Sequence, residues 1–201
     1  MRSAVILAGG NSRRMNVDKG LTLLKGEPII LHAKRRVAKV VDEVIIVVHT
    51  LEQQNSYRAV FNDDIVLDFN GESSPLLGAY TGLSQVHGSY TFMVGYDMPF
   101  IDSQVVERLF SLAEGNNAAT PIWPNGYVEP LHAVYRSSIA SEKAWQLLEK
   151  GEKRLRMILR ELPQVATLQV EEIRKIDPNL FTLFDVDSPE DLKNAQKILC
   201  P

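Results

Sequence analysis

Short apolar runs alternate with longer, partly polar segments over the first half of the chain. The runs have the length and composition of buried strands, and they lie at residues 4–7, 44–48, 65–67 and 91–94. The segments between and after them carry helical spacing or helix-start signals, at residues 29–40, 53–60, 75–87 and 104–112. Four strand–helix repeats predict an α/β fold with a mainly parallel sheet and helices on both faces.

The second half of the chain is less regular. Strands are expected at residues 118–122, 131–135 and 165–170, an extended segment at residues 180–186, and helices at residues 141–149, 154–162 and 189–199. Asn125-Gly126 is a turn signal between the first two of these strands, so the sheet is expected to be mixed. Ser188 is the expected cap of the last helix. No repeat, low-complexity tract or linker interrupts the sequence, and a single domain is expected over residues 1–201.

Composition and charge exclude several classes of protein. Hydrophobic residues make up 45% of the chain, which is ordinary for a globular protein. Lys and Arg total 22 against 25 for Asp and Glu, a net charge of -3, which gives no reason to expect nucleic-acid binding. No apolar run approaches the ~18 residues of a membrane span, and the lone Cys200 cannot form an intrachain disulfide. The sequence therefore predicts a cytoplasmic protein that binds neither nucleic acid nor a membrane.

Residues 7–15 carry the strongest chemical signal in the chain. They read Leu-Ala-Gly-Gly-Asn-Ser-Arg-Arg-Met and begin at the end of the first predicted strand. Gly9 and Gly10 let backbone N–H groups approach a phosphate without an intervening Cβ, while Arg14 and Lys19 supply positive charge. The spacing matches neither a P-loop nor the dinucleotide-binding Gly-x-Gly-x-x-Gly motif. Taken alone, the stretch fits a phosphate-binding loop or a glycine turn followed by a solvated basic loop.

Two aspartates follow predicted strands. Asp97 comes shortly after the strand at residues 91–94, at the edge where open α/β sheets bind ligands. Carboxylate oxygens are ligands for Mg²⁺, so Asp97 is expected to bind this metal. The alternative is a helix cap, a role that Ser103 fits better. Asp68 ends the strand at residues 65–67.

The helix expected after Asp68 contains two glycines four residues apart, Gly78 and Gly82. Without side chains they leave a low face on the helix. Such a face accommodates a flat nucleobase or packs tightly on the sheet, and the sequence leaves both alternatives open.

The glycine- and arginine-rich stretch also has a characteristic order of residues. Leu-Ala-Gly-Gly-x-Ser-x-Arg-Met, followed by Asp18-Lys19 and Leu21, resembles the signature of the molybdenum cofactor guanylyltransferases. The resemblance implies a single-domain, Rossmann-like nucleotidyltransferase fold whose N-terminal half binds the nucleotide and whose C-terminal half binds the acceptor. Asn16 departs from the family pattern, which usually has glycine there.

The resemblance also implies roles for individual residues. Arg14, Lys19 and Asp97 are the expected catalytic residues, because the first two match residues that contact the GTP phosphates and the third matches the ligand of Mg²⁺. The residues expected to bind the nucleotide are Leu7, Ala8, Gly9, Gly10, Lys19, Asp68, Gly78 and Asp97. His49 and Thr50 occupy a nucleotide-side position where relatives often have asparagine.

Near the C-terminus, residues 184–192 resemble the family's Asn-x-Asn-Thr-Pro-Glu-Asp-Leu, with Asp185 and Asp187 in place of the two asparagines. Alternation along an extended segment places these two carboxylates on one side. If that side faces the cleft, Asp187 is expected to share Mg²⁺ with Asp97, and Asp185 to lie beside the acceptor. If it faces solvent, Asp187 caps the last helix.

Residues 130–135 resemble the family's Pro-Leu-x-Ala-Leu-Tyr block, which lies beside the pterin-side substrate. The resemblance makes Pro130 and His132 expected acceptor-binding residues. A lone histidine in an apolar segment also fits a core position, and that alternative stays open for His132.

The implied reaction is transfer of GMP from GTP to the terminal phosphate of molybdopterin, with release of pyrophosphate. A phosphate monoester has a second pKa of about 6, so alignment and charge neutralisation suffice without a general base. The alternatives are cytidylyl transfer to the same cofactor, guanylyl transfer to another small phosphorylated acceptor, and a non-catalytic nucleotide-binding module. Transient contacts with other proteins of cofactor synthesis are a further expectation.

Overall fold

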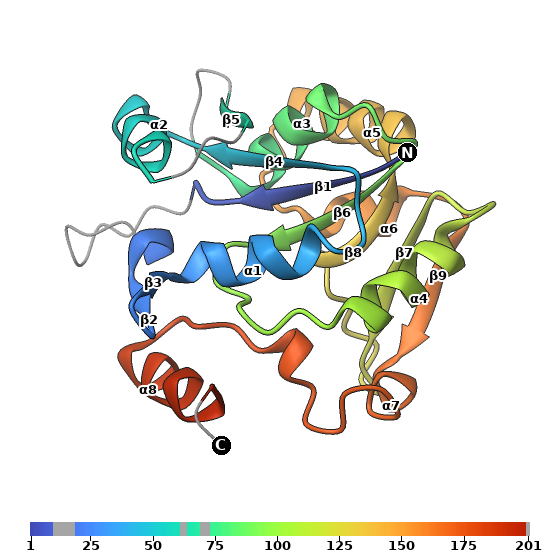
Figure 1. The fold of residues 1–201 in the computed structure, drawn as a ribbon. Coiled ribbons are helices and arrows are strands. Elements are labelled where there is room, and N and C mark those ends of the chain that lie inside the picture. The colour runs from blue at the N-terminus through green and yellow to red at the C-terminus, as the bar shows by residue number, and fades with distance from the viewer. Residues whose placement is uncertain (10–18, 61–63, 69–72, 200–201) are drawn as a thin grey trace.

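The computed structural model describes residues 1–9, 19–60, 64–68 and 73–199, which form an α/β fold (Figure 1). In these residues, seven strands make one sheet in the order β5-β4-β1-β6-β8-β7-β9. The strands are β1 Arg2–Leu7, β4 Glu43–Val48, β5 Asp64–Leu67, β6 Tyr90–Gly95, β7 Ala118–Ile122, β8 His132–Arg136 and β9 Val165–Gln169. A separate short pair consists of β2 Leu23–Leu24 and β3 Glu27–Pro28.

The pairing of the strands confirms the predicted mainly parallel, mixed sheet. β5, β4, β1 and β6 run parallel to one another. β8 is antiparallel to both β6 and β7, and β9 is parallel to β7. Consecutive residues Val5 and Ile6 of β1 are both fully buried, as expected where helices cover both faces of a sheet.

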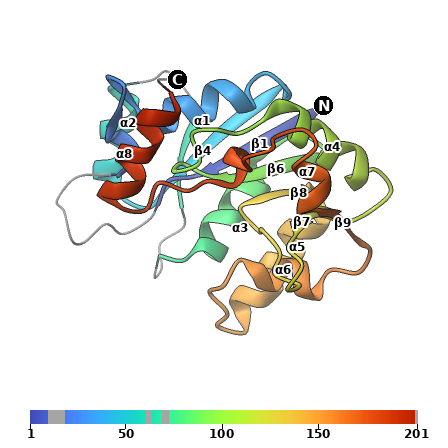
Figure 2. The same ribbon diagram turned by 90° about the horizontal axis from the view of Figure 1, so that it is seen from below.

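Helices lie on both faces of the sheet. They are α1 Ile29–Val37, α2 Leu51–Arg58, α3 Pro75–Gln85, α4 Ser103–Ala113, α5 Ser137–Glu149, α6 Arg156–Glu161, α7 Val170–Ile173 and α8 Pro189–Ile198. α3 and α5 cover one face, and α1 and α4 the other; both views place α7 and α8 on the side of α1 and α4 (Figures 1 and 2). None of the helices described is both long enough and apolar enough to cross a membrane.

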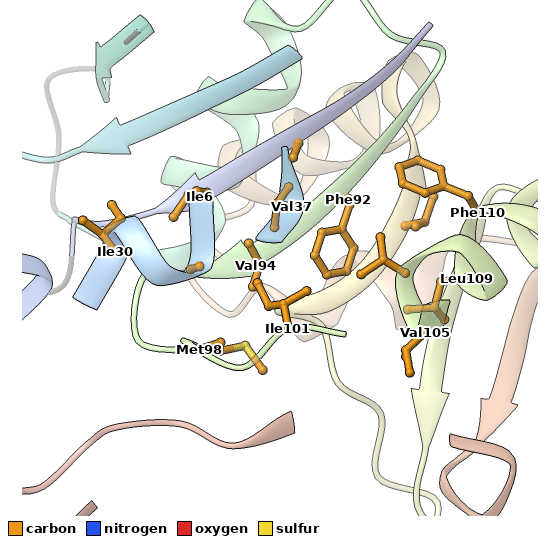
Figure 3. Close-up of a cluster of buried hydrophobic side chains, with 14 of the residues drawn as sticks. Ile6, Ile30, Val37, Phe92, Val94, Met98, Ile101, Val105, Leu109 and Phe110 are labelled. Carbon is orange, nitrogen blue, oxygen red and sulfur yellow. The ribbon is translucent and has the colours of Figure 1, made fainter. Parts of the chain in front are cut away.

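The main core lies between the sheet and the helices α1 and α4 (Figure 3). Ile30 and Val37 of α1, Phe92 of β6 and Val105 and Leu109 of α4 all belong to this cluster. Spacings of seven and four residues place each helical pair on one face of its helix. This layer fills the space on one side of the sheet, and the cavity described below lies on the other side, next to α3.

Two expectations about local structure are wrong. The cap of α4 is Asp102 and not Ser103, because the Asp102 carboxylate accepts the N–H of Gln104 at 2.8 Å. Residues 180–186 do not form one extended segment, since a 3-10 helix occupies Phe181–Leu183. The predicted cap of α8, in contrast, is confirmed at position 188.

Candidate active site

The order of the strands marks a position on the sheet where ligands bind. β1 is followed by β4 and β5 on one side and then by β6 on the other, so the connection reverses direction between β1 and β6. Open α/β sheets bind ligands at such a point, outside the carboxyl ends of the strands. A cavity of about 380 Å³ lies there, and its lining includes Leu7, Gly9, Asp68, Gly78, Asp97 and Leu131. Predicted site residues from separate segments therefore surround one cavity.

The predicted phosphate-binding loop leaves β1 at this cavity. Leu7 and Gly9 line the cavity, whereas Ala8 between them is buried. Gly10 and Arg14 lie outside the described residues. The first residues of the predicted loop therefore lie at the cavity. Residues 10–18, which would contact a phosphate, lie outside the described part of the chain.

Helix α3 forms one wall of the cavity, and its first turn is capped by Ser74. A Cβ on Gly78 would lie 3.4 Å from the Leu7 side chain, an ordinary contact distance, whereas a Cβ on Gly82 would lie only 2.5 Å from Val5. Gly82 therefore allows α3 to pack closely on the sheet, while Gly78 leaves space at the cavity. Of the two alternatives left open by the sequence, space for a nucleobase therefore fits Gly78, and tight packing on the sheet fits Gly82.

Asp97 lies on the loop that leaves β6 and lines the cavity. Gly95 permits this position, because a Cβ there would overlap the Oδ1 atom of Asp97. Loss of hydration, reinforced by the charge of Asp187, raises the pKa of Asp97 to about 6, although its own backbone N–H and Lys19 oppose the shift. The ionised form of Asp97 is therefore disfavoured here, and a cation beside it would relieve that cost.

The C-terminal segment is bound to this loop by one hydrogen bond and to Lys19 by another. The N–H of Val186 donates to the carbonyl of Asp97 at 2.9 Å, and Nζ of Lys19 donates to the carbonyl of Asp187 at 2.9 Å. Val186 is buried, while Asp185 and Asp187 on either side of it are exposed. The two carboxylates therefore share one side of the segment, as the alternation predicted.

Asp187 does not cap α8. Ser188 is the cap, because its hydroxyl accepts the N–H of Asp191 at 3.2 Å and the Asp191 carboxylate accepts the N–H of Ser188 at 2.8 Å. Loss of hydration, followed by the charges of neighbouring carboxylates of which Asp97 is the strongest, raises the pKa of Asp185 to about 7, although part of its surface reaches solvent. Asp187 is therefore not the helix cap, and the charges of Asp185 and Asp187 act on Asp97 or are acted on by it, although neither side chain lines the cavity.

Asp97 lines the cavity, and Asp185 and Asp187 add negative charge close to it. Within the described part of the chain, no three His, Cys, Asp or Glu side chains are grouped so as to hold a metal ion by themselves. Mg²⁺ does not require such a group, because it commonly takes one or two carboxylates and completes its octahedral shell with water and phosphate oxygens. The donor set fits Mg²⁺ that binds together with a polyphosphate.

Asp68 lies at the other end of the cavity, directly after β5. It is 6% exposed, and its Oδ1 atom is 2.8 Å from Nδ1 of His49. Loss of hydration raises the pKa of Asp68, and the hydrogen bond and charge of His49 oppose that rise. The sequence singled out His49 only as a minor candidate.

His132 does not line the cavity, and the structure corrects the expectation that it contacts the acceptor. Its side chain is fully buried, with its ring edge-on to Phe92 and its Nε2 atom 3.3 Å from the hydroxyl of Thr182. Burial lowers the pKa of His132 to about 3, so it is a neutral core residue. Leu131 directly precedes β8, whose first residue is His132, and Leu131 lines the cavity while His132 packs against Phe92 in the core.

Some lining residues were missed by sequence reasoning. Leu131 and Tyr96 line the cavity, and neither was predicted. Each is adjacent in sequence to a predicted residue, Leu131 to Pro130 and His132, and Tyr96 to Asp97. Alternation of side chains along the predicted strand at residues 131–135 was the signal that could have pointed to Leu131 as the lining residue in place of His132.

Glycines at the end of β1, a wall formed by α3 and a carboxylate after β6, where the strand connection reverses direction, are typical of α/β proteins that bind nucleotides. Comparison with known families agrees, because residues 4–166 match the family described as "MobA-like NTP transferase domain". The chain belongs to this family, and it is a nucleotidyltransferase. The family, the fold and the enzyme class predicted from the sequence are therefore confirmed.

Individual relatives extend the similarity over nearly the whole chain. A "Probable molybdenum cofactor guanylyltransferase" from Methanosarcina mazei is 34% identical, with 96% of this chain and 89% of the relative covered. One with the same name from Pyrococcus horikoshii is 33% identical, with 94% and 96% covered. The crystal structure of molybdopterin-guanine dinucleotide biosynthesis protein A from Archaeoglobus fulgidus superposes with a TM-score of 0.84 at 27% identity, covering 99% of this chain and 98% of that one.

Proposed function

We propose that this chain transfers GMP from GTP to the terminal phosphate of molybdopterin and releases pyrophosphate. The names of the relatives support this activity. The observation that carries it is the joint position of Asp97 and Lys19. The carboxylate follows β6 at the switch point, and the ammonium group is bound to the C-terminal segment that pairs with the Asp97 backbone. The proposed metal ligand and the proposed phosphate-binding cation are therefore close enough for the charge of Lys19 to act on Asp97.

The nucleoside would occupy the end of the cavity between the loop after β1 and helix α3. Gly9 and Gly78 leave space there for a flat base, and Leu7 and Val47 offer apolar surface. Asp68 adds an acceptor for the N–H or O–H donors of the nucleoside.

The triphosphate would lie at the end with Asp97. Asp97 and Asp187 would hold Mg²⁺, which when bound supplies a counter-charge for the phosphate oxygens and the leaving pyrophosphate. Lys19 places positive charge beside them. Contacts of Gly10 and Arg14 with the phosphates remain predictions from the resemblance.

The acceptor would approach from the side of β8 and the C-terminal segment. Leu131 lines the cavity there. The negative charges of Asp97, Asp187 and Glu129 help to raise the pKa of Asp185. Because the attacking phosphate is largely ionised at neutral pH, these residues need only align it and need not remove a proton. The proposal includes a cytoplasmic location, and transient contacts with other proteins of cofactor synthesis remain a prediction.

Calorimetric titration with GTP and CTP, each with and without Mg²⁺, tests the nucleotide and metal. A pyrophosphate-release assay with molybdopterin tests the transfer. We expect Mg²⁺-dependent binding that is tight for GTP only, and release of pyrophosphate that requires molybdopterin. Preference for CTP would favour the cytidylyltransferase alternative. Metal-independent binding without turnover would favour a non-catalytic module.

A further inference from the structure

His49 stands directly behind Asp68, at the end of β4. Asp68 lines the cavity, whereas His49 is not among the described residues that do so. The side chain of Asp68 is 4% exposed and that of His49 is 20% exposed, and their Oδ1 and Nδ1 atoms are 2.8 Å apart. The imidazole therefore contacts a buried carboxylate of the cavity wall without itself lining the cavity.

The contact has a defined direction. An ionised carboxylate can only accept hydrogen bonds, so Nδ1 of His49 carries the proton that lies between the two groups. This fixes the tautomer and the orientation of the ring when the histidine is neutral. One oxygen of Asp68 is thereby committed to His49, and the second remains to accept a hydrogen bond from a ligand in the cavity.

His49 is itself held in place by the start of α2. Its backbone N–H donates to Oε1 of Gln53 at 3.0 Å, and the Thr50 hydroxyl accepts the N–H of Gln53 at 3.1 Å in the cap of the helix. Nε2 of Gln53 donates to the carbonyl of Ala8 at 3.4 Å. A Cβ on Gly9 would lie 3.3 Å from the Cβ of His49. The backbone of His49 is thus fixed between α2 and the end of β1.

We propose that His49 is a positioning residue for nucleotide recognition, which holds Asp68 as an oriented acceptor for an N–H or O–H donor of the nucleoside. The inference rests on the proposed nucleotide-binding function. The donor is the N1–H or 2-amino group of guanine, or a ribose hydroxyl, since each fits a single carboxylate oxygen. Loss of hydration at Asp68 makes the role necessary, because without His49 the carboxylate is more readily protonated and free to rotate.

Two substitutions of His49 separate hydrogen bonding from packing. His49→Leu removes the donor at similar volume, and His49→Asn keeps an amide donor. In the full-length protein with Mg²⁺, we expect His49→Leu to raise the Kd and KM for GTP about 10- to 100-fold, the value of a charge-assisted hydrogen bond. The kcat at saturating GTP should stay close to that of the wild type. His49→Asn should recover most of the lost affinity.

Two GTP analogues identify the donor. ITP lacks the 2-amino group of guanine, and 2′-deoxy-GTP lacks one ribose hydroxyl. If the donor is the 2-amino group or the 2′-hydroxyl, the wild type should bind the matching analogue more weakly than GTP, and His49→Leu should bind that analogue and GTP alike, as expected for a lost pairwise interaction. Equal binding of GTP and both analogues by the wild type would assign the contact to N1–H or the 3′-hydroxyl. The analogue whose penalty disappears names the group that Asp68 contacts.

The chain offers a matched control in His87. Its Nδ1 atom lies 2.7 Å from Oε1 of Glu43, the residue that begins β4 at the opposite end of the sheet. His87→Leu should leave GTP affinity unchanged. Equal GTP affinity of wild type and His49→Leu would overturn the proposal, and so would equal losses in His49→Leu and His49→Asn. A wild type that binds GTP but releases no pyrophosphate counts instead against the proposed transfer, and the binding data still decide the role of His49.

Discussion

Asp68 and Asp97 occupy equivalent positions and have different surroundings. Each follows the carboxyl end of a parallel strand and lines the same cavity, and loss of hydration raises the pKa of each. Asp68 receives a hydrogen bond from His49. Asp97 has carboxylates for neighbours, Asp185 and Asp187, and Lys19 is bound to the backbone of the same segment.

The difference indicates what each end of the cavity is built to bind. A paired carboxylate is a fixed acceptor, suited to the hydrogen-bond donors of a nucleoside. A carboxylate whose described neighbours include other carboxylates, as at Asp97, suits a divalent cation that binds together with a polyphosphate. The following predictions test this division, from the largest expected effect to the smallest.

Replacing Asp97 should have the largest effect. Asp97→Asn should lower kcat by about 10²- to 10³-fold, the usual loss when a group that neutralises transition-state charge is removed. It should also make the metal-free protein more stable, because a poorly hydrated anion is removed, by about 1–2 kcal/mol. Pyrophosphate release and chemical denaturation measure the two effects. Near-normal turnover of Asp97→Asn would contradict the proposal that Asp97 binds the metal ion.

Two glycines separate positioning from packing. Gly95→Ala places a methyl group where Oδ1 of Asp97 lies, and a displacement of this kind should lower kcat by up to about 10²-fold. Gly82→Ala places a methyl group against Val5 and should lower the free energy of unfolding by about 1–3 kcal/mol through overpacking. Activity per folded molecule should persist in Gly82→Ala. If both variants lost only stability, Gly95 would have no specific role in placing Asp97.

Replacing Asp68 should affect binding and not the chemical step. Asp68→Asn keeps the shape of the side chain and removes its charge, and we expect a KM for GTP about 10- to 100-fold higher, at least as large a rise as for His49→Leu. The kcat and the Mg²⁺ dependence should remain near those of the wild type, which steady-state kinetics at several Mg²⁺ concentrations would show. A fall in kcat as large as that of Asp97→Asn would contradict the division, because Asp68 would then contribute to the chemical step and not only to nucleoside binding.

Most of the sheet could be predicted because its strands are short, apolar and buried on both faces, so that the sequence pattern alone marks them. The boundaries at turns and caps were harder. Asp102 precedes Ser103 as a competing cap, and nothing in the apolar pattern decides between them. The pair β2 and β3 is only two residues per strand, too short for alternation to be visible.

The site was predictable where chemistry follows a strand end, as at Asp97 and Asp68. It was not predictable where a partner comes from another element. The pairing of His49 with Asp68 spans β4 and β5, and the contact of Lys19 with Asp187 spans most of the chain. Such contacts depend on the tertiary fold. His132 shows the converse, because a family block suggested a site residue while the strand turned its side chain into the core.

His132 is a third poorly hydrated ionisable group beside Asp68 and Asp97. Unlike those two residues it does not line the cavity. Its Nδ1 atom has no hydrogen-bond partner among the described residues, and its pKa is lowered to about 3. The unfolded chain binds a proton at this histidine below its ordinary pKa of about 6.5, whereas the folded chain does so only below about 3. Stability should therefore be complete above the unfolded pKa and decline as the pH falls below it.

The expected decline is about 1.4 kcal/mol per pH unit below the unfolded pKa, which urea unfolding between neutral pH and pH 5 would measure. His132→Gln removes the titration and should flatten this part of the profile, while turnover at neutral pH stays near that of the wild type. His87→Gln is the control, because Glu43 raises the pKa of His87, and its contribution is lost as the pH rises. A loss of acceptor affinity in His132→Gln, with an unchanged stability profile, would return His132 to the site. The flattening would show instead that the fold alone keeps this histidine neutral, with no part in binding.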